Sequence, residues 1–261
     1  LAGSAGIDRR ACTGGGQTAR QVMAAAAPHL TPVPFELGGK SANIVFDDAD
    51  FDRAIDGSLV NIFSNSGQIC IAGSRILVQR GIAERFIEAF VARARALTVG
   101  NPLDPSTEVG PMAFKAHQER VLEHIARAQS EGATLLCGGA ARTDLGDGYF
   151  VAPTVFQVDS NQLSLCQEEV FGPVVSIQVF DDDDEALSLA NDSRFGLVGY
   201  CWTNSLARAQ AFQQRVEAGT LWINTPLARD LRAPFGGFKE SGIGRDGPRQ
   251  AADFFTEEKA T

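Results

Sequence analysis

The sequence predicts an α/β fold in which a largely parallel sheet is flanked by helices. Short apolar, β-branched runs alternate with amphipathic runs of helical length along most of the chain. Strands and helices that alternate at this spacing indicate βαβ units, whose strands run parallel. The 261 residues, 44% of them hydrophobic, are enough to bury a large core, and no internal repeat or linker divides them.

The first elements are predicted from hydrophobic spacing. The apolar run 41–48 predicts a buried strand, and 50–67 predicts a helix because apolar residues recur at helical spacing after an acidic first turn. Residues 75–79 predict another strand. A helix over 82–97 presents one apolar face, formed by Phe86, Ile87, Phe90, Val91 and Ala94.

The second half follows the same pattern after a surface excursion at 98–112, which holds three prolines and two glycines. The acidic run 180–186 is interpreted as a helix start, because the other ligands of a calcium site are missing. The remaining predicted elements are a helix with Val121, Leu122, Ile125 and Ala128 inward, strands at 134–139, 174–180 and 220–224, and a helix at 205–219 that ends at Gly219.

Charge and composition exclude several classes. The net charge of −9 argues against a nucleic-acid partner, and no apolar run approaches the ~20 residues of a membrane span. Five widely spaced cysteines without a CxxC pair disfavour a disulfide framework or a metal site and indicate a reducing, cytoplasmic compartment. A start at Leu1 without a signal peptide is typical of a fragment or a processed product.

Cys70 differs from the other cysteines in its surroundings. Gly67, Gly73 and other small residues beside it permit close approach of backbone or ligand, whereas the other four lie in or beside apolar runs and are interpreted as structural. If the helix after Asp50 ends near Gly67, Cys70 lies on the following loop with its sulfur facing a cleft. These residues alone leave both core filling and nucleophilic catalysis open.

A nucleophilic thiol needs a base, and Glu36 offers one. It precedes two glycines in FELGGKS (35–41), so its carboxylate lies at the end of a predicted strand beside a flexible turn. An exposed acid at the end of a strand is the alternative interpretation of this stretch.

Several motifs in order resemble the aldehyde dehydrogenase superfamily. Cys70 in its GQxC stretch follows Glu36 of ELGGKS by 34 residues. The other motifs are EEVFGPV (168–174), NDSRFGLVGYCWT (191–203), LWINTP (221–226) and APFGGFKESGIGRDG (233–247). The resemblance covers nearly the whole chain but only the second part of the longer family members.

The resemblance implies that Cys70 is the nucleophile and Glu36 the general base. The implied reaction oxidises an aldehyde to the acid through a cysteine thiohemiacetal and thioester, with hydride transfer to NAD or NADP. The residues implied to contact the cofactor are Thr13, Gly14, Gly15, Leu37, Gly38, Glu169 and Phe171. Those implied to contact the substrate are Ile69, Ile71, Arg229 and Phe235.

The resemblance also implies a domain organisation. Residues 1–38 would be the end of a dinucleotide-binding domain, 39–240 the catalytic domain, and 241–261 a return segment that packs towards the cofactor domain. A homo-oligomer, dimer or tetramer, is expected if the segments that the family has beyond this chain are present. The alternatives are a thiol esterase that needs no cofactor and an inactive assembly subunit.

Two departures from the family pattern concern the site. His117 occupies the place of a cofactor-adjacent glutamine, but an exposed helical histidine is the favoured interpretation. The loop 225–235 resembles the substrate-entrance loop and carries Arg229 and Arg232. A guanidinium there could receive a substrate carboxylate, as in a semialdehyde, and ordinary surface arginines are an equal alternative.

Overall fold

The computed structural model describes residues 2–261. None of the helices in this range is both long and apolar enough to cross a bilayer. The strands are β1 Cys12–Thr13, β2 Phe35–Glu36, β3 Ala42–Val45, β4 Arg75–Gln79, β5 Thr134–Cys137, β6 Thr154–Gln157, β7 Val174–Phe180, β8 Phe195–Gly196, β9 Val198–Trp202, β10 Thr220–Ile223, β11 Phe238–Lys239 and β12 Gly242–Ile243. The α-helices are α1 Gly16–Ala26, α2 Phe51–Phe63, α3 Arg80–Ala96, α4 Lys115–Ser130, α5 Ser164–Gln167, α6 Asp183–Asn191, α7 Leu206–Arg215 and α8 Pro248–Phe255. Short 3-10 turns cover Ala27–His29, Ser64–Gly67 and Thr143–Leu145.

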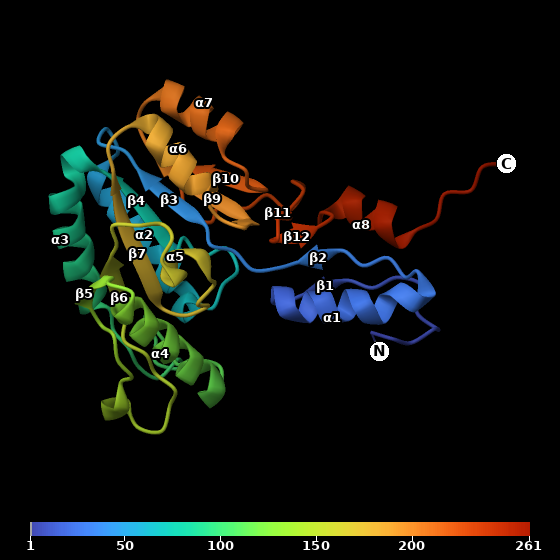
Figure 1. Cartoon of the computed structure of the whole chain (residues 1–261), viewed down its shortest axis with the longest axis horizontal. Coiled ribbons are helices and arrows are strands. Elements are labelled where there is room, and N and C mark those ends of the chain that lie inside the picture. Colours follow the sequence, from blue (N-terminus) through green and yellow to red (C-terminus); the bar gives the residue numbers. More distant parts are fainter. Residues whose placement is uncertain (1) are drawn as a thin grey trace.

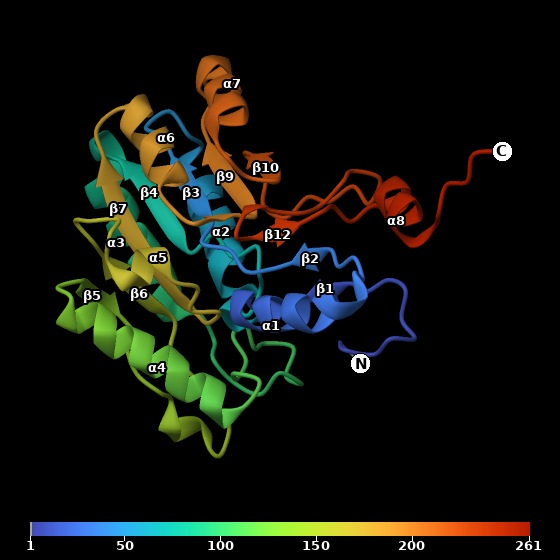
Figure 2. The ribbon, with the colours of Figure 1, turned by 45° about the vertical axis from the view of Figure 1, so that its right-hand side comes forward.

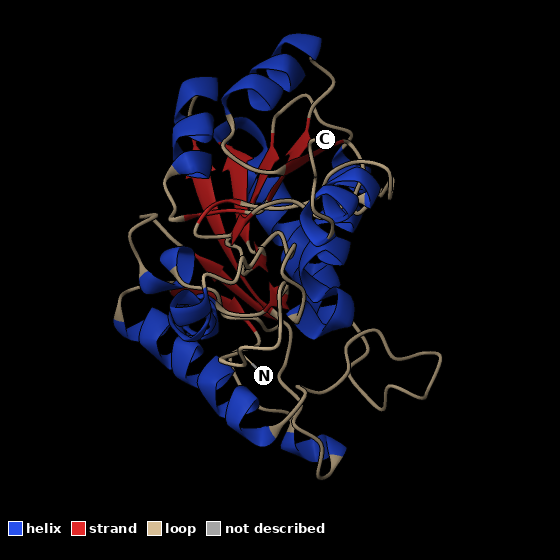
Figure 3. Cartoon of the chain, turned by 90° about the vertical axis from the view of Figure 1, so that its right-hand side faces the viewer, coloured by secondary structure: helices blue, strands red, loops and turns tan. Residues whose placement is uncertain are grey.

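The main sheet has the strand order β10-β9-β3-β4-β7-β6-β5. All neighbouring pairs are parallel except β5 with β6, which is antiparallel. Helices lie on both sides of this sheet (Figure 1 and Figure 3). The predicted α/β class with a largely parallel sheet is confirmed.

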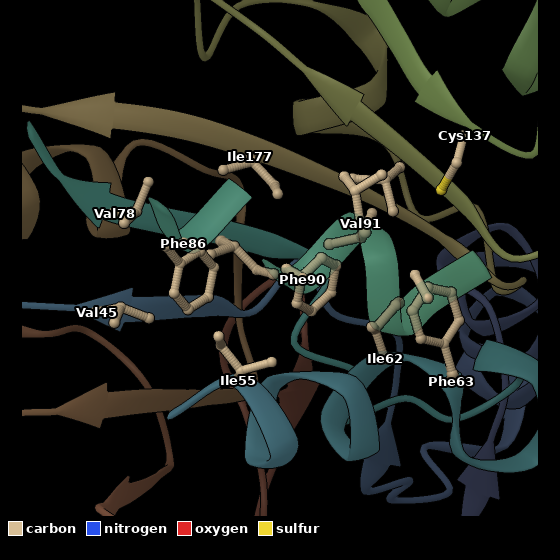
Figure 4. Close-up of a cluster of buried hydrophobic side chains, with 14 of the residues drawn as sticks. Val45, Ile55, Ile62, Phe63, Val78, Phe86, Phe90, Val91, Cys137 and Ile177 are labelled. Carbon is tan, nitrogen blue, oxygen red and sulfur yellow. The ribbon is translucent and has the colours of Figure 1, made fainter. Parts of the chain in front are cut away.

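Side chains of alternating strand positions build two cores, one on each face of the sheet. On one face, α2 and α3 pack over Val45, Val78 and Ile177 and contribute the stacked rings of Phe86 and Phe90 (Figure 4). On the other face, α6 and α7 cover the part of the sheet around β9 and β3, and α4 and α5 cover the part around β6. The buried strands therefore carry apolar residues on both faces.

A second, smaller sheet, of the order β1-β2-β12, joins a segment from the first part of the chain to one from the last part. β2 pairs with β1 in parallel and with β12 in antiparallel, so residues 35–36 contact 242–243. We call β1, β2, β12, α1 and α8 the arm; it extends to one side of the main sheet and holds both termini (Figure 1 and Figure 2). The chain enters the main sheet through residues 37–41 and returns to the arm through 225–241.

Some element predictions need correction. The helix predicted over 205–219 ends at Arg215, because Val216 adopts an extended backbone and Gly219 instead donates to the carbonyl of Leu197. The strand predicted over 41–48 is confined to β3. Sequence reasoning also did not identify β6 and β9, although each is a short apolar run.

Candidate active site

A cavity of about 860 Å³ lies between the arm and the main sheet. Many of the segments that line it directly precede β3, β4, β7 and β9, so the cavity lies at the amino ends of these strands. Ligands of open α/β sheets usually bind at the opposite, carboxyl edge. The predicted site residues that line the cavity are Thr13, Gly14, Gly15, Glu36, Leu37, Gly38, Ile69, Cys70, Glu169 and Phe171.

The loop that carries Cys70 is shaped by left-handed residues at 65–67. Gly67 has a φ of 71°, and a Cβ at this position would lie 2.1 Å from the carbonyl oxygen of Gly172. Only glycine fits such a backbone so close to a neighbouring chain segment. The reversal brings the chain from the end of α2 to the cavity and then into β4.

The Cys70 thiol is partly buried and lies beside two acids. Burial raises its pKa, and the charges of Glu169 and Glu36 raise it further. The backbone N–H groups of Cys70 and Ile71 act in the opposite direction, since they stabilise the thiolate. The resting group is therefore a neutral thiol that needs a base before it can attack.

The other cysteines do not line the cavity. Cys12 is half-buried in β1, and three are fully buried: Cys137, Cys166 and Cys201. Cys70 is thus the thiol that a ligand in the cavity can reach.

Glu36 is the last residue of β2 and lies between β1 and β12. Its Oε2 is buried and has no hydrogen-bond partner among residues 2–261. Burial and the charge of Asp246 raise its pKa to about 7, although Arg245 and Arg229 act in the opposite direction. A carboxyl group with this pKa can both accept and release a proton near neutral pH.

The glycine pair after Glu36 lets three segments meet at the cavity. A Cβ on Gly38 would lie 2.1 Å from Oε2 of Glu169, and one on Gly39 would lie 2.8 Å from the carbonyl oxygen of Cys70. The N–H of Gly39 also donates to Oε1 of Glu169 at 3.1 Å. Side chains at these positions would separate three groups: Glu36, Glu169 and the loop that carries Cys70. We call this last segment, residues 68–74, the thiol loop.

His117 corrects the prediction of an exposed helical histidine. It is buried at 8% exposure on α4 and lines the cavity. Its Nε2 lies 2.7 Å from the carbonyl oxygen of Phe171, and because a carbonyl only accepts, Nε2 carries the hydrogen. Phe171 itself has a φ of 55°, so His117 holds a residue in an unfavourable backbone region.

The glycine-rich turn leads into α1 at the edge of the cavity. No side chain caps this helix, and Gly15, Gly16 and Gln17 line the cavity. The free N–H groups of a first helical turn can bind an anion such as phosphate. A Cβ at Gly14 or Gly15 would meet nothing within 4 Å, so the turn leaves open space beside it.

The remaining predicted substrate residues lie beside the cavity but do not line it. Ile71 and Phe235 pack against Tyr200 and Trp222, in the same cluster as the side chain of Cys70. This cluster joins the thiol loop to the loop 225–235.

The two arginines of loop 225–235 differ in their contacts. The guanidinium of Arg229 lies 5.0 Å from the ring centroid of Phe235, and its charge acts on Glu36. Arg232 has a side chain 88% exposed and pairs with Asp230 at 2.7 Å. Both arginines are exposed, and Arg229 differs from Arg232 in that its charge acts on Glu36.

Sequence reasoning missed several charged residues that line the cavity. Their signals are weak, since each arginine or acid is equally typical of a solvated helix or loop. At the cavity edge, the guanidinium of Arg20 donates a hydrogen bond to Oε2 of Glu240, with a donor–acceptor distance of 2.9 Å. This bond links α1 to the residue directly before the return segment 241–261. The lining residues that were not identified are Gly16, Gln17, Arg20, Gln68, Arg120, His124, Glu168, Val170, Arg194, Phe195 and Glu240.

Residues 1–261 match the model of the aldehyde dehydrogenase family. The betaine aldehyde dehydrogenase of Rhizobium leguminosarum bv. trifolii is 45% identical over 248 residues, which cover 95% of this chain and 51% of the relative. That of Mesorhizobium japonicum is 41% identical over 262 residues, which cover 100% of this chain and 54% of the relative. The chain spans about half the length of the curated relatives it matches.

Solved structures agree with these matches. HpcC from Thermus thermophilus superposes with a TM-score of 0.97 at 43% identity, over 98% of this chain and 51% of that one. Betaine aldehyde dehydrogenase from Staphylococcus aureus in complex with NAD+ gives a TM-score of 0.94 at 40% identity, over 97% and 51%.

Proposed function

The chain belongs to the aldehyde dehydrogenase family, and from this premise we propose that residues 1–261 supply the nucleophile and base of an enzyme that oxidises an aldehyde to a carboxylic acid. The observation that carries the proposal is the position of Cys70 and Glu36 on one cavity, with the pKa of Glu36 raised to about 7. A base and a reactive thiol that share a cavity form the pair that covalent catalysis by cysteine requires.

The first step forms a bond between Sγ of Cys70 and the aldehyde carbon. The thiol proton passes to water in the cavity as Sγ attacks, because burial and nearby acids disfavour a free thiolate in the resting state. The carbonyl electrons move to oxygen, and the backbone N–H groups of Cys70 and Ile71 beside Sγ are the proposed donors to the developing charge. Removal of one such donor typically costs about 3 kcal/mol of transition-state stabilisation.

A nicotinamide cofactor supplies the hydride acceptor when it is bound. The residues present fit such a group: the uncapped start of α1 suits a pyrophosphate, and the Glu169 carboxylate at the cavity wall suits ribose hydroxyls. Phe171 would lie against the nicotinamide, Thr13 would lie with Gly14 and Gly15 beside the pyrophosphate, and Leu37 and Gly38 would also contact the cofactor. Both NAD and NADP satisfy these contacts.

The second step releases the acid from the thioester on Cys70. Glu36 takes a proton from water, the water oxygen attacks the carbonyl carbon, and the C–S bond breaks with return of a proton to sulfur. Its pKa near neutrality suits this carboxylate to accept the proton of water and then to release it to the departing sulfur.

For the substrate, we propose an aldehyde that carries a negative charge. Three of the four similar proteins named above are betaine aldehyde dehydrogenases, and betaine aldehyde is a cation. The guanidinium of Arg229 above Phe235 would repel a cation and attract a carboxylate. Ile69, Ile71 and Phe235 would contact the rest of the molecule.

The proposed domain organisation also has structural support. The small sheet is built from residues before 38 and after 241, the two segments expected to belong to the cofactor side. We further propose a homo-oligomer, dimer or tetramer, which sedimentation velocity would measure.

The test mixes the complete polypeptide that contains residues 1–261 with neutral, cationic and carboxylate-bearing aldehydes and with NAD or NADP. Absorbance of the reduced nicotinamide should rise fastest with a carboxylate-bearing aldehyde, and Arg229→Ala should reduce that preference. Cys70→Ser should abolish the signal, and the matched control Cys12→Ser should retain it. Hydrolysis of an aryl ester without any nicotinamide signal would instead support the cofactor-independent esterase, and no activity of either kind would support an assembly role.

A further inference from the structure

Tyr200 holds the residue that follows the proposed nucleophile. It lies in the middle of β9 at 0% exposure, and its hydroxyl donates to the carbonyl oxygen of Ile71 at 2.8 Å. Ile71 also supplies one of the two backbone N–H groups that face Sγ of Cys70. The Ile71 carbonyl belongs to the peptide plane that follows the Ile71 N–H, so this hydrogen bond anchors the loop one peptide unit beyond Cys70 and limits movement of the loop as a whole.

The ring of Tyr200 stacks on Trp222, the neighbouring residue on β10. The ring centroids are 5.1 Å apart with an interplanar angle of 12°. The indole N–H of Trp222 donates to the carbonyl oxygen of Ala228, next to Arg229. One aromatic pair thus contacts both the thiol loop and the loop 225–235.

We propose that Tyr200 is a positioning residue that orients Cys70 through Ile71 and couples the thiol loop, through Trp222, to the loop 225–235. The inference rests on the proposed role of Cys70 as the nucleophile. A tyrosine that only filled space in the core would be replaced by phenylalanine without consequence for the thiol. The hydroxyl on Ile71 is what separates the two roles, because phenylalanine keeps the ring and its stack.

The experiment compares Tyr200→Phe with Tyr149→Phe in the complete polypeptide. The chain has two tyrosines, and Tyr149 is 38% exposed and does not line the cavity. Two rates are measured: alkylation of the Cys70 peptide by iodoacetamide, followed by mass spectrometry, and NAD-dependent aldehyde oxidation. Loss of one buried hydrogen bond that orients the loop should lower the alkylation rate and kcat about 3- to 10-fold, with a smaller change in the KM for aldehyde.

The outcomes separate this inference from the proposed function. If the unmodified protein oxidises no aldehyde with NAD or NADP, the proposed function fails. If it is active and Tyr200→Phe matches Tyr149→Phe in both rates, even with a lower Tm, the positioning role is wrong.

If Tyr200→Phe does not fold, Trp222→Phe takes its place. This variant keeps the hydroxyl on Ile71 but removes the indole N–H that holds Ala228. A higher KM for aldehyde with slower alkylation supports the coupling, and two unchanged values contradict it.

Discussion

Replacement of Glu36 by Gln should stabilise the fold at alkaline pH. An acid whose pKa rises from 4.5 to about 7 on folding keeps its proton longer in the folded state than in the unfolded state. The folded state therefore loses stability as the pH rises from about 4.5 to 7, and the loss is complete above 7. A shift of this size corresponds to roughly 3 kcal/mol, and partial access of solvent to the carboxyl reduces the expected value to about 1–2 kcal/mol.

Glutamine has nearly the same shape but does not ionise, and the carboxylate it replaces has its buried Oε2 without a hydrogen-bond partner among residues 2–261. Urea unfolding at pH 4.5 and pH 8.5 measures the difference between Glu36→Gln and the unmodified protein. The gain should be near zero at the lower pH and about 1–2 kcal/mol at the higher. The exposed Glu88→Gln on α3 is the matched control and should show no such gain. An equal gain at both pH values, or none at pH 8.5, would refute a buried ionisable base at position 36.

Two further predictions concern the surroundings of the pair. Gly38→Ala should lower kcat about 10- to 100-fold, because its Cβ would displace the Glu169 carboxylate and with it the loops around Cys70. Steady-state rates test this, and activity equal to that of Gly81→Ala, at the start of α3 and outside the cavity lining, would contradict it. Arg75→Met should destabilise the fold by about 3–5 kcal/mol, because the buried guanidinium donates to the carbonyl oxygens of residues 40, 189 and 190 and to the side chain of residue 161. Urea unfolding measures that loss, and a value below about 1 kcal/mol would show that these acceptors find other partners.

The main sheet could be predicted because its strands are buried on both faces and its helices are amphipathic. In the arm, the strand that ends at Glu36 could be predicted, but β1 and β12 could not, since they have two residues each and show no periodicity. The pairing of β12 with β2 brings residue 36 beside residue 242, a contact that depends on the return of the chain from the main sheet. Local sequence carries no signal for such a distant partner.

The site was partly visible in the sequence. Cys70 and Glu36 could be proposed as the catalytic pair because a thiol among small residues and an acid before two glycines are each unusual, and together they match a family pattern. His117 was misjudged although the signal existed, because it lies one helical turn before Val121, on the buried face that continues to Ile125 and Ala128. A polar residue on an apolar stripe indicates a buried hydrogen bond, here to Phe171.

Intact-mass and peptide analysis of the Glu36→Gln variant tests the central claim most directly. The complete polypeptide is incubated with a carboxylate-bearing aldehyde and NAD, and the thioester should accumulate because the base that activates water is missing. We expect an acyl mass on the peptide that contains Cys70, with about one equivalent of reduced nicotinamide per site. An active protein with the acyl group on another cysteine, or with no covalent adduct, would contradict the assignment of Cys70 as the nucleophile.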